Sequence, residues 1–138
     1  MRPLLADQSR PNLEGVPSVP LHGVGEYLLP RYNVAPTQNV LGVRNDGRGE
    51  IEPLRWGLLP SGSTGTGLIN ARAESLASKP SFRDAFRSRR CILFADGFYE
   101  WKARRPIRFS LEGGAAFAFA GLWEPQGDEL PICTIVTC

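Results

Sequence analysis

The stretch Cys91-Ile-Leu-Phe-Ala-Asp-Gly-Phe-Tyr-Glu-Trp101 decides the predicted fold, because two short apolar runs flank a single glycine turn. Apolar runs separated in this way are typical of short strands. The stretch also places the carboxylate of Glu100 between two aromatic residues. A buried acid is costly unless it is paired, hydrogen-bonded or protonated. Glu100 is therefore a candidate acid/base residue in a partly dry pocket.

A plain structural interpretation of Glu100 stays open beside this one. Alternation along a strand puts Phe98 and Glu100 on one face and Tyr99 and Trp101 on the other. A solvated strand face would then explain the carboxylate without any chemistry.

Further short runs and turns on both sides of this stretch predict a mixed α+β domain dominated by antiparallel strands. Val40–Arg44 and Ile51–Leu58 flank the turn Asn45-Asp46-Gly47, which predicts a hairpin. The other expected strands are Cys91–Ala95, Phe98–Lys102, Ile107–Leu111, Ala116–Trp123 and Ile132–Thr137.

Two segments favour helical structure. A helix is expected from Ser81, a candidate N-cap, because Phe82, Ala85 and Phe86 are spaced to share one face. Residues 73–77 are expected to form a helical turn.

The length of 138 residues fits one domain that can bury a core. Residues 1–30 are rich in proline and glycine and are expected to form an irregular arm, with the domain over 31–138. The last strand candidate runs into the chain end at Cys138. The sequence therefore predicts a domain that is truncated at its C-terminus.

The charge is unevenly distributed around a formal net charge of +2. Residues 31–110 carry 14 bases against 7 acids, whereas residues 1–30 sum to −1 and residues 111–138 to −4. Fourteen of the sixteen bases are arginine, which suits phosphate contact and stacking on bases. A nucleic-acid partner is one interpretation. A GC-rich genome with surface arginines is the other.

Several classes of protein are disfavoured. The three cysteines lack metal-like spacing, and no His/Cys cluster or phosphate loop is present, so we expect no metal and no cofactor. His22 is the single histidine and lies in the arm. Cys91 opens an apolar run and is expected to be a core residue. No apolar run suits a membrane span or a signal peptide, which favours a cytoplasmic protein with reduced thiols.

Two further spots carry polar candidates. Asn70 follows two aliphatic residues, and Arg72 lies two residues on, so an extended segment would present both on one face. An amide there can orient a substrate, and the arginine can reach a phosphate. A turn-forming asparagine and a surface arginine are the alternative. Asn33 and Pro36 mark an irregular spot for which a structural turn is the stronger interpretation.

Four segments in order resemble the SRAP family, the SOS response-associated peptidases or abasic-site processing proteins. They are Arg31-Tyr-Asn-Val-Ala-Pro-Thr-Gln38, Leu54–Leu59, Asn70-Ala-Arg-Ala-Glu74 and Arg89–Trp101. The resemblance covers about residues 31–137 and implies a barrel-like β-fold with a few short helices. It also implies a monomer that binds single-stranded DNA at abasic sites, in the cytoplasm and associated with the nucleoid.

The resemblance assigns roles to particular residues. Glu100 matches the glutamate that shuttles protons, and Asn70 the asparagine that holds the lesion, so both are expected to be catalytic. Arg72 matches an arginine on the DNA backbone. Pro36 and Trp56 match walls of the same cleft, and Asn33 completes the expected DNA-binding set.

Family chemistry is peptidase- or lyase-like and joins an N-terminal cysteine to the abasic sugar as a thiazolidine. This sequence begins Met1-Arg2 and stops before the family's downstream His-x-Arg motif, and its loop Ser61–Gly67 has no aromatic residue to wedge DNA. The sequence therefore predicts impaired covalent chemistry. A non-catalytic nucleic-acid-binding module and an inactive gene fragment are the alternatives. A cysteine hydrolase built on Cys91 or Cys133 would lack a suitable histidine partner.

Overall fold

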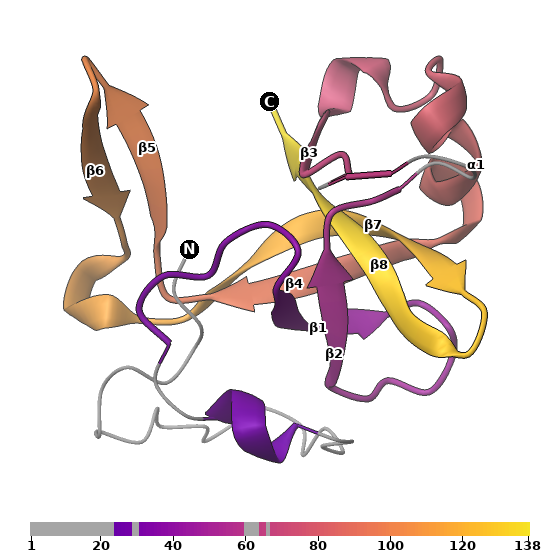
Figure 1. The fold of residues 1–138 in the computed structure, drawn as a ribbon, viewed down its shortest axis with the longest axis horizontal. Helices are drawn as coiled ribbons and strands as arrows, with labels where there is room; N and C mark the ends of the chain where they lie inside the picture. The colour runs from indigo at the N-terminus through magenta and orange to yellow at the C-terminus, as the bar shows by residue number, and fades with distance from the viewer. Residues whose placement is uncertain (1–23, 29–30, 60–63, 66) are drawn as a thin grey trace.

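The computed structural model describes residues 24–28, 31–59, 64–65 and 67–138. Five strands pair in a closed ring (Figure 1). In order of pairing they are β1 (Asn39–Arg44), β2 (Glu52–Trp56), β8 (Glu129–Thr137), β7 (Phe117–Gln126) and β4 (Arg90–Ala95). All neighbours run antiparallel except β2 and β8, which close the ring in parallel. The predicted α+β class with a mainly antiparallel, barrel-like sheet is confirmed.

Strand β8 has one partner on one edge and two on the other. Its first edge pairs with β7. On the second edge Ile132 and Cys133 pair with β2, and Ile135–Thr137 then pair with the short strand β3 (Asn70–Arg72). Reciprocal hydrogen bonds between Leu58 and Leu68, at 3.0 and 2.7 Å, join the segments that lead out of β2 and into β3. This arrangement carries Asn70 and Arg72 beyond the closed part of the sheet.

The barrel interior is filled by alternate residues of its strands. In β4 the inward residues are Cys91, Leu93 and Ala95. The expectation that Cys91 is a core residue is confirmed, since it packs in the main buried cluster. Its neighbour across the ladder is Gly121. A Cβ at that glycine would lie 2.8 Å from the Cys91 sulfur, so the sulfur fills the place of a side chain there.

Helix α1 (Pro80–Ser88) covers a second buried cluster on the outside of the barrel. Phe82 and Ala85 pack with Leu122 of β7, which confirms the predicted helix and two residues of its apolar face; the third, Phe86, is 39% exposed and lies outside this cluster. The predicted N-cap at Ser81 is wrong, because the helix begins one residue earlier at Pro80 and Lys79 occupies the cap position. Proline is favoured in the first turn of a helix since it has no N–H to leave unsatisfied.

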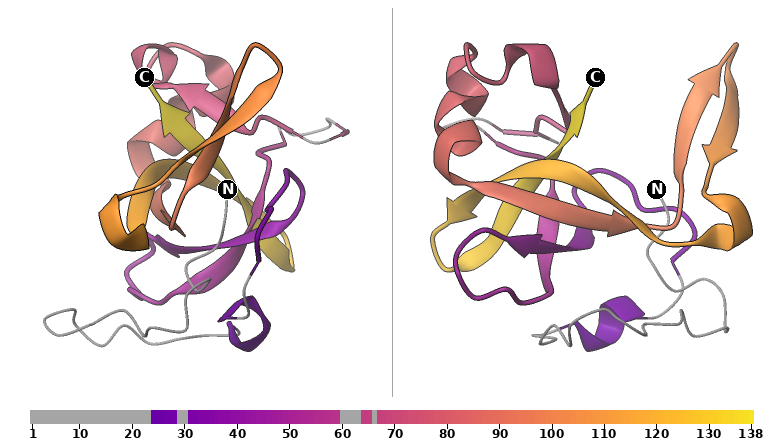
Figure 2. Two further views of the ribbon diagram at one scale, coloured as in Figure 1. Left: turned by 90° about the vertical axis from the view of Figure 1, so that its left-hand side faces the viewer. Right: turned by 180° about the vertical axis from the view of Figure 1, so that it is seen from behind.

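Strands β5 (Phe98–Lys102) and β6 (Arg105–Phe109) form a separate hairpin that stands away from the barrel (Figures 1 and 2). The Phe98 ring stacks on Phe109 at 5.2 Å and meets Phe119 edge-on at 5.6 Å, which fixes the base of the hairpin to β7. Strand β6 begins two residues before the predicted Ile107. Its turn has only two residues, Ala103 and Arg104, both with positive φ, as tight hairpin turns require.

The described residues also include three short 3₁₀ turns: η1 (Gly25–Leu28), η2 (Ala73–Ser75) and η3 (Glu112–Gly114). The second confirms the helical turn expected at residues 73–77. Most of the predicted N-terminal arm, His22 with it, and most of the loop Ser61–Gly67 lie outside the described residues. In the described part of the chain, no helix has the length and apolar character needed to cross a membrane.

Candidate functional site

Asn70 and Arg72 line one cavity of about 430 Å³ at the end of β3. The cavity lies between this strand, the start of α1 and the end of β8, and its lining residues are Leu68, Asn70, Arg72, Lys79, Ser81, Phe82 and Thr137. Such a volume is within the range of small-ligand sites in proteins. The polar pair expected from the sequence thus shares one concave surface.

The local sequence explains why these two side chains share a face. Ala71, between them, is 1% exposed and packs with Leu76 and Phe82. Because strand residues alternate, Asn70 and Arg72 are both exposed on the other face.

The polar lining of the cavity carries positive charge and no acid. Arg72 and Lys79 are its cations, and the neutral polar members are Asn70, Ser81 and Thr137. None of these five side chains makes a hydrogen bond or ion pair with another described residue. They are therefore free to bind an anionic or polar ligand. The sequence did not point to Lys79 or Ser81 as site residues, and the Lys-Pro-Ser run at the start of the helix was the available signal.

Trp56 supports the strand that carries Asn70. Its indole N–H donates to the Ile69 carbonyl at 2.9 Å, and only 9% of the residue is exposed. The main chain of Trp56 also holds the turn at Pro36: the Thr37 N–H donates to the Trp56 carbonyl at 2.7 Å, and the Trp56 N–H donates to the Gln38 carbonyl at 2.9 Å. Trp56 thus connects the turn at Pro36, through its main chain, with the strand that begins at Asn70, through its indole. Asn33 is exposed and lines neither this cavity nor the second one.

Glu100 lies apart from this cavity, on the β5–β6 hairpin. It pairs with Ile107, is exposed, and has no hydrogen-bond or ion-pair partner among the described residues. A partly dry pocket around Glu100 was expected, but the described residues leave this carboxylate exposed, because the hairpin stands out from the barrel. In Figures 1 and 2 the hairpin and β3 flank the segment 31–38 from opposite sides. This exposed position fits the solvated strand face that the sequence left open as the plain interpretation of Glu100.

A second cavity of about 350 Å³ lies beside segment 31–38, lined by Tyr27, Arg31, Thr37, Gln38 and Asn39. Three of its polar side chains, Tyr27, Arg31 and Asn39, contact one another or the adjoining main chain. Arg31 donates to the Asn39 carbonyl and lies over the Tyr27 ring at 5.8 Å, and the Asn39 amide donates to the Tyr27 hydroxyl at 2.8 Å. These contacts hold the segment against β1, which suits a structural role.

The buried thiols do not suit nucleophilic chemistry. Burial raises the pKa of Cys91 to about 12, although the nearby charge of Arg44 partly opposes it. Burial, reinforced by Cys91, raises the pKa of Cys133 well above its usual range. Since the thiolate is the reactive form, neither residue supports the cysteine hydrolase alternative.

The sequence of this chain is similar to a family of known proteins. Residues 15–138 match the family described as SOS response associated peptidase (SRAP). Abasic site processing protein YoqW of Bacillus subtilis is 49% identical over a 127-residue alignment that covers 82% of this chain and 56% of YoqW. Abasic site processing protein YedK of Escherichia coli is 41% identical over 73 residues, covering 52% of this chain and 33% of YedK.

The fold is also similar to that of a solved structure. A phage-related protein of Bordetella bronchiseptica aligns with a TM-score of 0.65 and 32% identity, covering 78% of this chain and 56% of that one. The chain spans about half the length of the curated relatives that match most of it.

Proposed function

This chain belongs to the SOS response associated peptidase (SRAP) family, and on that basis we propose that it binds single-stranded DNA at an abasic site. The choice of an abasic site as the ligand comes from the relatives, which are named abasic site processing proteins. The observation that carries the proposal is the cavity at the end of β3, which combines two cations with an amide and contains no acid. An abasic nucleotide has a charged phosphodiester on each side and no base, so a small cationic cavity suits it.

In this proposal Arg72 binds the phosphate and Asn70 binds the abasic sugar. The Arg72 guanidinium binds a phosphate oxygen pair, since its planar fork matches that geometry. The Asn70 amide, which donates and accepts, holds the hydroxyl or aldehyde of the ring-opened sugar. Trp56 and Pro36 hold the strand and turn beside the lesion, and Asn33 contacts the DNA on the exposed side of that turn.

Glu100 shuttles protons in this proposal. Its support is the resemblance of the segment Arg89–Trp101 to the family, together with an exposed carboxylate that can exchange protons with solvent. The role requires the hairpin to reach the lesion over segment 31–38. We propose a monomer that acts on DNA in the cytoplasm, associated with the nucleoid, as the family resemblance implies.

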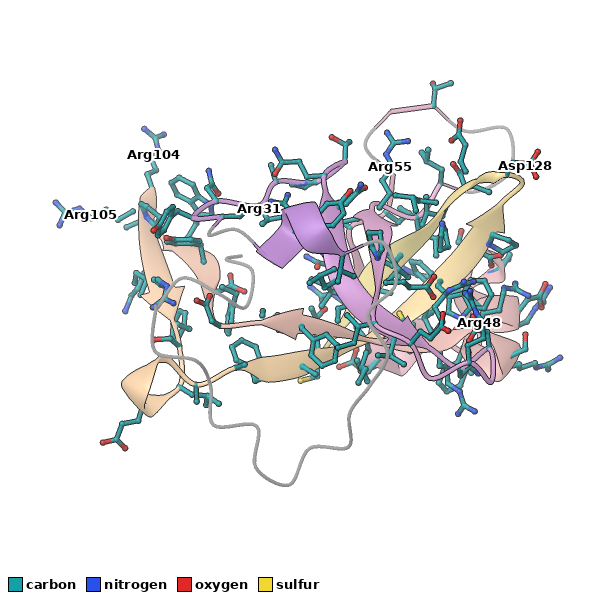
Figure 3. All side chains as sticks on the ribbon, turned by 90° about the horizontal axis from the view of Figure 1, so that it is seen from below. Arg31, Arg48, Arg55, Arg104, Arg105 and Asp128 are labelled. Carbon is teal, nitrogen blue, oxygen red and sulfur yellow. The ribbon has the colours of Figure 1, made fainter. Side chains whose placement is uncertain are left out.

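Sequence-independent nucleic-acid binding is the second candidate. The tip of the β5–β6 hairpin carries Lys102, Arg104 and Arg105, all exposed. In Figure 3, Arg104 and Arg105 extend outward from this tip. Basic residues of this kind bind phosphates without regard to a lesion.

The affinity for matched oligonucleotides tests the proposal. Fluorescence anisotropy should give a Kd for single-stranded DNA with one abasic site that is at least about tenfold lower than for the intact strand, a difference of about 1.4 kcal/mol. Equal affinity for both strands would support the second candidate. Absence of binding at low salt would overturn both. In the same samples, borohydride converts any imine to a stable amine, so a denaturing gel reports whether a covalent step occurs.

A further inference from the structure

Lys79 and Ser81 line the same cavity as Arg72 but come from a different element. Lys79 precedes helix α1, and Ser81 lies in its first turn. Arg72 ends the strand β3 that pairs with the end of β8. Cationic groups from two different elements therefore line one cavity, which distinguishes Arg72 from an isolated arginine on the surface.

The backbone at Lys79 is held in place before any ligand arrives. Its N–H donates to the Ser75 carbonyl at 3.0 Å, and its own carbonyl accepts from the N–H groups of Phe82 and Arg83 at 3.0 and 2.9 Å. Phe82 itself is 4% exposed, which anchors the start of the helix in the second buried cluster. Preorganised groups lose less freedom on binding.

The lysine charge is also not used elsewhere. Its ammonium group has no ion pair with a described residue, whereas most arginines near the β1–β2 turn are paired: Arg44 with Glu52 and Arg48 with Asp46. An unpaired lysine and an unpaired arginine at one cavity repel each other. An anion between them removes that repulsion and gains a charge-assisted hydrogen bond from each side.

We propose that Lys79 and Ser81 form the second wall of a phosphate-binding cavity and, with Arg72, hold the phosphodiester next to the lesion. This inference rests on the proposed function, because it names the part of the abasic strand that the cavity takes. Arg72 supplies the bidentate contact, Lys79 the point charge and Ser81 a hydroxyl donor. The abasic sugar then lies toward Asn70.

The test compares Lys79→Gln with Arg87→Gln on single-stranded abasic DNA. Both variants lose one positive charge near the same helix, but Arg87 lies in its last turn, roughly 9 Å along the axis from Ser81. Lys79→Gln should weaken binding about tenfold and reduce the salt slope by about 0.7. Arg87→Gln should stay within about twofold of the parent chain. Lys79→Arg should restore most of the affinity.

A second oligonucleotide locates the phosphate. It carries an uncharged methylphosphonate in place of the phosphodiester on one side of the abasic site, with a partner oligonucleotide for the other side. On the oligonucleotide whose methylphosphonate replaces the phosphate that Lys79 binds, Lys79→Gln and the parent chain should have equal Kd values. The Lys79–phosphate contact is already absent there.

Two results would overturn the inference while leaving the proposed function intact. One is lesion-selective binding that Lys79→Gln and Arg87→Gln weaken to the same extent. The other is a Lys79→Gln penalty that persists on both methylphosphonate strands. Loss of lesion selectivity in the parent chain would instead overturn the proposed function itself.

Discussion

Trp56 donates its indole N–H to the main-chain carbonyl of Ile69 at 2.9 Å, so a side chain of strand β2 fixes the strand that begins at Asn70. The same carbonyl also accepts from the Ile135 N–H at 3.1 Å. Trp56→Phe therefore removes one hydrogen bond and some packing without orphaning the acceptor. The free energy of unfolding in urea should fall by about 1–2 kcal/mol.

Trp101→Phe is the matched control, because Trp101 is 71% exposed and its indole has no hydrogen bond to a described residue. Its stability should stay within about 0.5 kcal/mol of the parent chain. Equal effects at the two tryptophans would contradict the supporting role of Trp56.

Gly121→Ala should destabilise the barrel. Its Cβ would lie 2.8 Å from the Cys91 sulfur and 2.9 Å from the Thr134 carbonyl, and the second of these is backbone that cannot turn aside. Overpacking of this kind costs about 1–3 kcal/mol, measurable by urea unfolding. Gly25→Ala, with no described atom within 4 Å of its Cβ, should unfold as the parent chain does. A neutral Gly121→Ala would show that the β4–β7 packing is looser than described.

Asp46 should make stability depend on pH at the acid end. Its burial alone would raise the pKa, but hydrogen bonds from Arg48 and the charges of Arg44 and Arg48 outweigh burial and lower it. An unfolded aspartate titrates near about 3.9. The contribution of ionised Asp46 to the free energy of unfolding is thus complete above that pH, and it is lost as the pH falls through the lowered pKa of the folded state.

Asp46→Asn should therefore be less stable than the parent chain near neutral pH, and the difference should shrink below about pH 3.9. Urea midpoints from neutral to acid pH measure it. Asp128→Asn is the control, since Asp128 is an exposed turn residue with no ion pair to a described residue. A gap for Asp46→Asn that is constant with pH would contradict the ion-pair assignment.

Thiol labelling should distinguish the three cysteines. Cys138 is exposed, whereas Cys91 and Cys133 are buried with raised pKa values. Near about pH 8, a thiol reagent should modify one cysteine per folded chain quickly and the other two only after denaturation. Fast labelling of Cys91 in the folded chain would contradict its burial and would make it a candidate nucleophile again.

Residue patterns predicted local features of the fold, whereas the barrel-like sheet was expected only from the family resemblance, and the strand pairing that closes it was not predicted. The turn Asn45-Asp46-Gly47 predicted the β1–β2 hairpin through ordinary turn chemistry. The parallel pairing of β2 with β8 joins residues far apart in the chain and leaves no local pattern. The start of β6 was missed because its turn, Ala103-Arg104, lacks the glycine or asparagine that normally marks positive φ.

The candidate site shows the same division. The two-residue spacing of Asn70 and Arg72 was enough to place them on one face of a strand. Lys79 joins them through tertiary packing of α1, which spacing does not encode. Alternation around Glu100 fits a barrel strand and a projecting hairpin equally well, so the sequence left both a partly dry pocket and a solvated face open.

The most direct test of the central claim, that the cavity at β3 recognises the lesion, compares Arg72→Gln with Arg104→Gln. The quantity measured is the ratio of the Kd for intact single-stranded DNA to the Kd for the abasic strand. Arg72→Gln should lower this ratio about tenfold, because a phosphate reaches Arg72 inside the cavity only where the strand has no base to keep it out. Arg104→Gln, at the exposed hairpin tip, should leave the ratio unchanged even if both affinities fall. An unchanged ratio in Arg72→Gln would contradict the account.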